Sequence, residues 1–137
     1  MDAGNVIHMR AVYDAFNRRD FDGLADLLDP EVVFEEAEPR GDRQRARIGR
    51  ERLLEYLTSW WDAWATVHWD VYDAREDEGR VLTLCTVRGR PRGTDTEIER
   101  RMGHISRFRD GCLLYSRSYV DVDMAAADFE GGVGAAV

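Results

Sequence analysis

The sequence contains no lysine: all 19 basic residues among its 137 residues are arginine. Chemistry that depends on a lysine amine, such as Schiff-base formation or proton transfer by a neutral amine, is therefore excluded. The 27 acidic residues outnumber the arginines and give a formal net charge of −8. This charge argues against nucleic acid and anionic membrane surfaces as partners, because both attract basic patches.

Groups that bind metals or cofactors are also scarce. The three histidines, His8, His68 and His104, are scattered along the sequence without the spacing of a metal site. There is no nucleophile elbow and no glycine-rich phosphate loop. We therefore expect neither a metal nor a cofactor. The two cysteines, Cys85 and Cys112, show no motif spacing and are expected to be reduced structural thiols.

Long apolar runs are missing as well. No segment approaches the roughly 20 apolar residues of a membrane span, and the N-terminus, MDAGNVIHMR, lacks the apolar segment of a signal peptide. We therefore expect a cytoplasmic protein. The composition, 44% apolar and 34% charged, is typical of a soluble globular protein. We expect residues 1–137 to form a single domain with its own core and a loose tail from about residue 130.

Apolar periodicity predicts three helices in the first half of the chain. The first covers roughly residues 5–17, and its buried face is formed by Val6, Met9, Tyr13 and Phe16. Asp20 is expected to cap a short second helix, and Gly49 to open the third. The third helix carries an aromatic stripe, Trp60, Trp61 and Trp64. Such a stripe is usually core, but flat rings also line pockets, and we expect Trp60 and Trp64 to border a cavity.

The remaining pattern predicts strands. A short strand is expected at residues 32–35, and alternation then predicts longer strands at 67–74, 81–88, 96–108 and after the turn at Asp110-Gly111. The arginine-rich segment 36–50 is expected to be a solvated loop, with an anion-binding flap as the alternative. Residues 123–129 are expected to form a final helical turn. This order predicts an α+β cone, in which a curved, mostly antiparallel sheet wraps around helices and leaves a conical cavity.

The hairpin formed by residues 100–123 carries the main site signal. Apolar and hydroxyl side chains share one of its faces, as expected for the wall of a partly polar cavity. This face carries Met102, His104, Ser106, Phe108, Leu114, Ser116 and Ser118. The opposite face carries a mixture that is enriched at interfaces, Tyr115, Arg117 and Tyr119. We therefore expect a homodimer that forms through this second face.

The chain resembles the SnoaL-like branch of the NTF2-like superfamily. The resemblance covers roughly residues 5–129, and three features carry it: AFNRRDFDGLADLLDPEVVF, the helix opening Gly49-Arg50-Glu51, and GHISRFRDGCLLYSRSYVDVDMA. It implies the cone fold, but the superfamily includes isomerases, cyclases, dehydratases, epoxide hydrolases and non-catalytic members. The Arg-x-Asp pattern of limonene epoxide hydrolases would fall near Cys85 and Val87 and is absent.

The resemblance also implies roles for particular residues. In ketosteroid isomerases the carboxylate base follows the short first strand, where this chain has Glu35. The acid that helps to hold their enolate lies where this chain has His104, and their oxyanion tyrosine aligns with Val12, next to Tyr13. Polyketide cyclases of the SnoaL type keep a histidine at the His104 position, whereas their acid–base aspartate aligns with Ser118.

We therefore predict a protein that binds a small apolar or aromatic, carbonyl-bearing molecule without a cofactor. In the catalytic version, an isomerase or cyclase, Glu35 is the base and His104 polarises or protonates the developing oxyanion. The alternative is a non-catalytic ligand-binding or dimerisation module, in which polar neighbours satisfy His104 and solvent surrounds Glu35. The residues expected to line the pocket are Tyr13, Trp60, Trp64, Met102, Ser106, Ser116 and Ser118.

Overall fold

The structure is a computed structural model that describes residues 3–37 and 46–135. This part of the chain forms four helices: α1 (Ala3–Asn17), α2 (Phe21–Asp26), α3 (Arg50–Ala63) and α4 (Val122–Glu130). It also forms six strands: β1 (Leu28–Glu36), β2 (Ala46–Ile48), β3 (Trp64–Asp77), β4 (Arg80–Pro91), β5 (Ile98–Arg109) and β6 (Cys112–Tyr119). None of these helices is long and apolar enough to cross a membrane.

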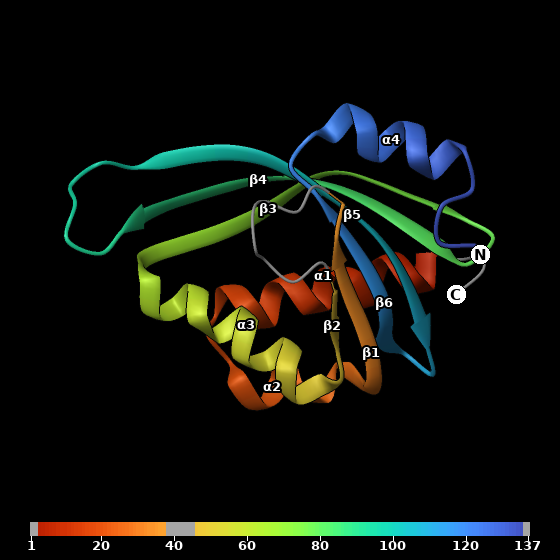
Figure 1. The fold of residues 1–137 in the computed structure, drawn as a ribbon, viewed down its shortest axis with the longest axis horizontal. Coiled ribbons are helices and arrows are strands. Elements are labelled where there is room, and N and C mark those ends of the chain that lie inside the picture. The colour runs from red at the N-terminus through yellow and green to blue at the C-terminus, as the bar shows by residue number, and fades with distance from the viewer. Residues whose placement is uncertain (1–2, 38–45, 136–137) are drawn as a thin grey trace.

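The six strands form one curved sheet in the order β2-β1-β6-β5-β4-β3. β1 pairs with β6 in parallel, and every other neighbouring pair is antiparallel. Figure 1 shows α1, α2 and α3 on the concave side of the sheet, with α4 across the opposite face. The predicted α+β cone with a mostly antiparallel sheet is therefore confirmed.

Local signals in the sequence place several of these boundaries. Asp20 caps α2, because its carboxylate accepts a hydrogen bond from the backbone N–H of Gly23 at 3.0 Å. Gly49 precedes α3 with a φ of 99°, which a residue with a side chain rarely adopts. Asp110 and Gly111 have φ values of 53° and 80°, so the predicted hairpin turn between β5 and β6 is confirmed.

Three segments are more ordered than we expected. β1 is longer than the predicted strand 32–35, and the arginine-rich segment contains β2; residues 38–45 of the predicted loop lie outside the described residues. The segment after α4, expected to be loose, packs against the sheet. Buried Arg80 donates hydrogen bonds to the backbone oxygens of Phe129 at 2.7 Å and Val133 at 3.1 Å.

The outer face of the sheet is covered by α4, which was predicted as a single turn. Tyr119 is fully buried there, and its hydroxyl donates to a carboxylate oxygen of Asp128 in α4 at 2.8 Å. Tyr115 is also buried, and Arg117 is mostly covered. The face on which we based a homodimer is thus packed within the chain, and the homodimer stays a prediction for light scattering to test.

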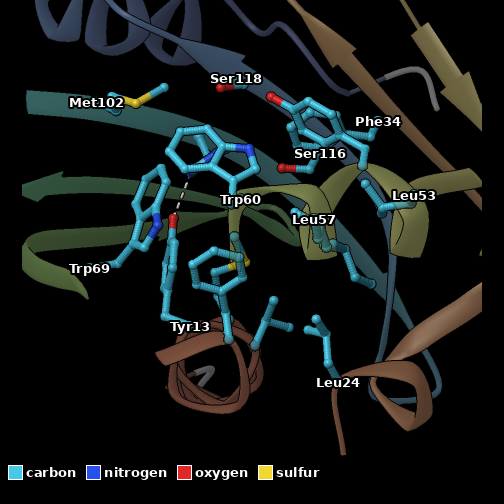
Figure 2. Close-up of a pocket in the computed structure, with 16 residues that line it drawn as sticks. Tyr13, Leu24, Phe34, Leu53, Leu57, Trp60, Trp69, Met102, Ser116 and Ser118 are labelled. Carbon is cyan, nitrogen blue, oxygen red and sulfur yellow. Dashed lines mark hydrogen bonds between the residues drawn. The ribbon is translucent and has the colours of Figure 1, made fainter. Parts of the chain in front are cut away.

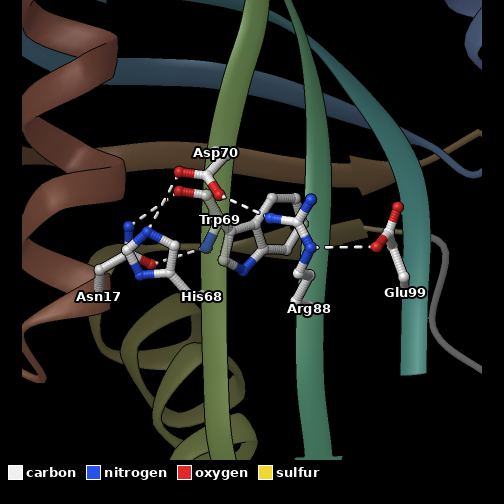
Figure 3. A network of polar contacts seen from close by, with 6 residues as sticks. All are labelled: Asn17, His68, Trp69, Asp70, Arg88 and Glu99. Atoms are coloured by element: carbon white, nitrogen blue, oxygen red, sulfur yellow. Dashed lines mark hydrogen bonds and ion pairs between the residues drawn. The ribbon is translucent and has the colours of Figure 1, made fainter. Parts of the chain in front are cut away.

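One edge strand of the sheet, β3, is tied to the end of α1. The side-chain amide of Asn17 donates to the backbone oxygen of Trp69 and accepts from its N–H, both at 2.9 Å (Figure 3). These bonds satisfy backbone groups that an edge strand leaves unpaired. On the exposed side, Arg88 bridges Asp70 and Glu99 across three strands (Figure 3). The edge that closes the cone is therefore fixed to the helix beneath it.

Candidate functional site

A cavity of about 70 Å³ lies between the concave side of the sheet and helices α1 and α3. Its wall is mostly apolar, and Figure 2 shows Leu53, Leu57, Trp60, Trp69 and Met102 around it. Phe16 also lies on the wall. The polar side chains on the wall are Tyr13, Tyr56, His104, Ser116 and Ser118. An apolar enclosure with a few placed polar groups is the usual form of a small-molecule site.

The polar end of this cavity is a short chain of hydrogen bonds. The hydroxyl of Tyr13 lies 2.6 Å from Nδ1 of His104 and 2.8 Å from Oγ1 of Thr83. Thr83 and His104 are paired across β4 and β5, so both side chains point to the concave side. Tyr13 reaches them from α1, where it lies on the buried face with Met9. Three separate elements thus build this group.

Burial keeps these groups neutral. Removal from water lowers the pKa of His104 from 6.5 to about 4, because the charged imidazolium loses its hydration. The same desolvation raises the pKa of Tyr13 well above its usual value and that of the neighbouring Cys85 thiol to about 11. At neutral pH the cavity therefore presents an uncharged imidazole and a phenol, with the protonated thiol of Cys85 buried behind them.

Five of the residues predicted to line a pocket do line this cavity: Tyr13, Trp60, Met102, Ser116 and Ser118. Two others lie elsewhere. Ser106 is fully buried behind the wall, with its hydroxyl 3.0 Å from that of Ser116. Trp64 stacks on Trp60, with ring centroids 6.2 Å apart, and covers Gly89 on β4. A β-carbon at Gly89 would lie 2.8 Å from the Trp64 ring, so this packing requires glycine.

Glu35 lies on the other face of the sheet from His104. Side chains alternate along β1, and Phe34 points into the cavity, so its neighbour Glu35 points away. The Glu35 carboxylate accepts a hydrogen bond from the Tyr115 hydroxyl at 2.8 Å and pairs with the guanidinium of Arg117. The structure therefore does not bring the predicted base and His104 together, and Glu35 is not simply solvent-exposed either.

Two features of the site were not predicted. We expected Leu114 on the cavity face, but a register shift between β5 and β6 brings Leu113 to the wall instead. Thr83 was not singled out, although the sequence carries a signal: Thr83, Cys85 and Val87 alternate along one face of β4, and all three are buried. Within the described residues, no group of three or more metal-binding side chains is placed to hold an ion.

The cone with its largely apolar cavity has the NTF2-like fold. Residues 9–115 match the profile of the SnoaL-like domain, so the chain belongs to the SnoaL-like family and the predicted resemblance is confirmed. No curated protein matches the chain.

Many solved structures share this fold. One is IdmH, a proposed polyketide cyclase from Streptomyces antibioticus, with 24% identity, a TM-score of 0.74 and coverage of 92% of this chain and 98% of IdmH. An NTF2-like protein of unknown function from Burkholderia pseudomallei gives 21% identity, a TM-score of 0.74 and coverage of 95% and 97%. TerC, crystallised with polyporic acid, gives 19% identity, a TM-score of 0.73 and coverage of 93% and 98%. At these identities the likeness shows the fold alone.

Proposed function

We propose that this protein binds a small apolar or aromatic molecule with a carbonyl group in the cavity between α1, α3 and the sheet. The observation that carries the proposal is the hydrogen-bonded Tyr13–His104 pair on the wall of a largely apolar cavity. The apolar wall takes the body of the ligand, and neutral His104 meets its carbonyl oxygen. The co-crystal of TerC with polyporic acid supports binding within this fold.

The proposed reaction depends on stabilisation of a negatively charged oxygen by His104. A group that holds a carbonyl oxygen in apolar surroundings stabilises the negative charge that develops there when a neighbouring carbon loses a proton to water. His104 is placed for this role in a cofactor-independent isomerisation or cyclisation. Cyclisation is also the reaction proposed for IdmH, which shares this fold. Glu35 is not part of the proposal, because its carboxylate lies on the other face of the sheet.

A non-catalytic binding protein is the second candidate, and the same placement of Glu35 favours it. No Asp or Glu is among the residues on the described cavity wall, so no carboxylate base is at hand. The two candidates share the ligand and differ in what happens to it. Deuterium incorporation next to the carbonyl separates them, because only a catalytic site speeds the exchange of those protons.

Thermal-shift measurements with acetophenone and larger aromatic ketones test the binding. A ligand at 100 times its Kd adds about 2.7 kcal/mol to the free energy of unfolding and raises Tm. His104→Gln should weaken this shift, whereas His68→Gln, which changes an exposed histidine on β3, should leave it intact. If no aromatic ketone raises Tm, or if both variants respond alike, the proposal is wrong.

The exchange experiment then uses any ketone that binds. Protein is incubated with the ketone in D₂O, and loss of the proton signal next to the carbonyl is followed by NMR. Faster exchange with wild type than with His104→Gln supports the isomerase or cyclase class. Binding without faster exchange selects the non-catalytic class.

A further inference from the structure

The hydrogen bonds among Thr83, Tyr13 and His104 can run in two directions. Each hydroxyl has one proton to donate, and a neutral imidazole has one protonated and one unprotonated nitrogen. Thr83 is fully buried and Tyr13 and His104 nearly so. Within the described residues, Tyr13 is the hydrogen-bond partner of the Thr83 hydroxyl, and Nε2 of His104 has no partner.

One direction satisfies every hydroxyl proton. Thr83 donates to Tyr13, Tyr13 donates to Nδ1 of His104, and the ring proton sits on Nε2. In the reverse direction Nδ1–H donates to Tyr13, and Tyr13 donates either to Thr83 or to the Cys85 thiol beside it. Donation to Thr83 leaves the Thr83 proton buried without an acceptor in the described part of the chain, which is costly. Donation to Cys85 gives the Tyr13 proton sulfur, a weak acceptor, in place of the imidazole nitrogen. The first direction is therefore favoured.

We propose that Thr83 is a positioning residue that acts through Tyr13, and that His104 offers an Nε2–H donor to the ligand in the cavity. This inference deepens the proposed function and rests on it for the ligand. The Tyr13 proton is committed to Nδ1, so Tyr13 orients the imidazole while His104 makes the polar contact. Burial favours the neutral ring that this arrangement needs, since it lowers the pKa of His104 to about 4.

The direction of the hydrogen bonds from Thr83 to His104 determines which kind of ligand His104 can bind. A terminal N–H binds an acceptor, such as the oxygen of a ketone or quinone, and gives no contact to an ammonium group, which can only donate. Hydrogen bonds in a chain also polarise one another, so the Thr83 proton on Tyr13 strengthens the Tyr13 bond to Nδ1 and makes Nε2–H a better donor. The Nε2–H contact thus favours ligands that accept a hydrogen bond over ligands that can only donate one.

Long-range ¹H–¹⁵N NMR of the histidine rings at neutral pH tests the direction without any ligand. His104→Gln assigns the signals. We expect Nδ1 of His104 to show the shift of an unprotonated, hydrogen-bonded nitrogen and Nε2 that of a protonated one. A protonated Nδ1 in the wild-type protein would overturn the proposal.

Three variants on β4 test the role of Thr83. Thr83→Val should move the Nδ1 signal toward that of an unbonded ring nitrogen, and Thr83→Ser should restore it. Thr86→Val makes the same change on the opposite face of the strand, where the residue pairs with Arg101, and should leave the signal unchanged. If Thr83→Val leaves Nδ1 where it was, Thr83 is only a packing residue and the proposal fails.

A matched pair of probes tests the selection of ligands. Acetophenone and α-methylstyrene have nearly the same shape, but only the ketone accepts a hydrogen bond. We expect acetophenone to bind about three- to tenfold more tightly, as one hydrogen bond allows, and Thr83→Val to reduce this ratio. Equal affinities in wild type would refute the donor contact. If neither probe nor any larger ketone binds while the NMR result holds, the proposed function fails and the orientation of His104 stands.

Discussion

Protonation of His104 should destabilise the native protein in mild acid. The ring is buried without an acidic partner, and its pKa falls from 6.5 to about 4. A residue with a lowered native pKa contributes stability that is fully present above pH 6.5 and is lost as the pH falls toward 4, because the unfolded chain takes up the proton first. The fall from 6.5 to about 4 corresponds to about 3 kcal/mol.

The comparison with His104→Gln isolates this contribution. Glutamine keeps a polar side chain and does not titrate, so the other ionisable groups affect both proteins equally. Urea denaturation followed by tryptophan fluorescence should be measured at intervals between pH 7 and pH 4. We expect the wild type to lose about 3 kcal/mol more than His104→Gln over this range. His68→Gln, at an exposed site, should follow the wild type. Parallel curves for the wild type and His104→Gln would refute the reasoning.

Three further predictions concern the cavity wall, an ion pair and the outer helix. Trp64→Ala should lower the free energy of unfolding by up to about 3 kcal/mol in urea titrations and leave ketone affinity unchanged, whereas Trp60→Ala should alter the affinity. Arg109 hydrogen-bonds Asp29 and holds the pKa of that carboxyl below its usual range. Arg109→Met should therefore raise the Asp29 pKa, measured by carbon NMR, and the part of the stability that Asp29 loses as acid is added should become smaller. Tyr119→Phe removes the bond to α4 and should cost about 1 kcal/mol, with faster amide exchange in that helix; unchanged exchange would contradict it.

The parts of the fold that depend on neighbouring residues were predictable from the sequence. Asp20 caps a helix through its own side chain, and the turn at Asp110-Gly111 depends on two residues that tolerate positive φ. Alternation along β5 also placed Met102 and His104 on one face, because period two is a property of any strand. The arrangement of these elements in a cone was predicted from the family resemblance.

The features that we did not predict depend on contacts between segments that are distant in the sequence. Nothing near Glu35 in the sequence indicates that Tyr115 and Arg117 will hold its carboxylate on the outer face. The register shift in the last hairpin, which turns Leu113 to the cavity, follows from strand pairing and not from local propensity. Tyr13 was predicted to line the pocket, but its bond to His104 joins α1 to β5 and was visible only in three dimensions.

The parallel pairing of β1 with β6 constrains the order in which the chain can fold. Leu28 pairs with Leu113, so β1 gains its long neighbour only after the last strand has been synthesised. Until then its other partner, β2, is a strand of only three residues. The backbone edge of β1 that will face β6 has no strand partner during this interval. Closing so long a loop is slow, so synthesis on the ribosome, more than the finished fold, is the stage at which this protein is most open to aggregation.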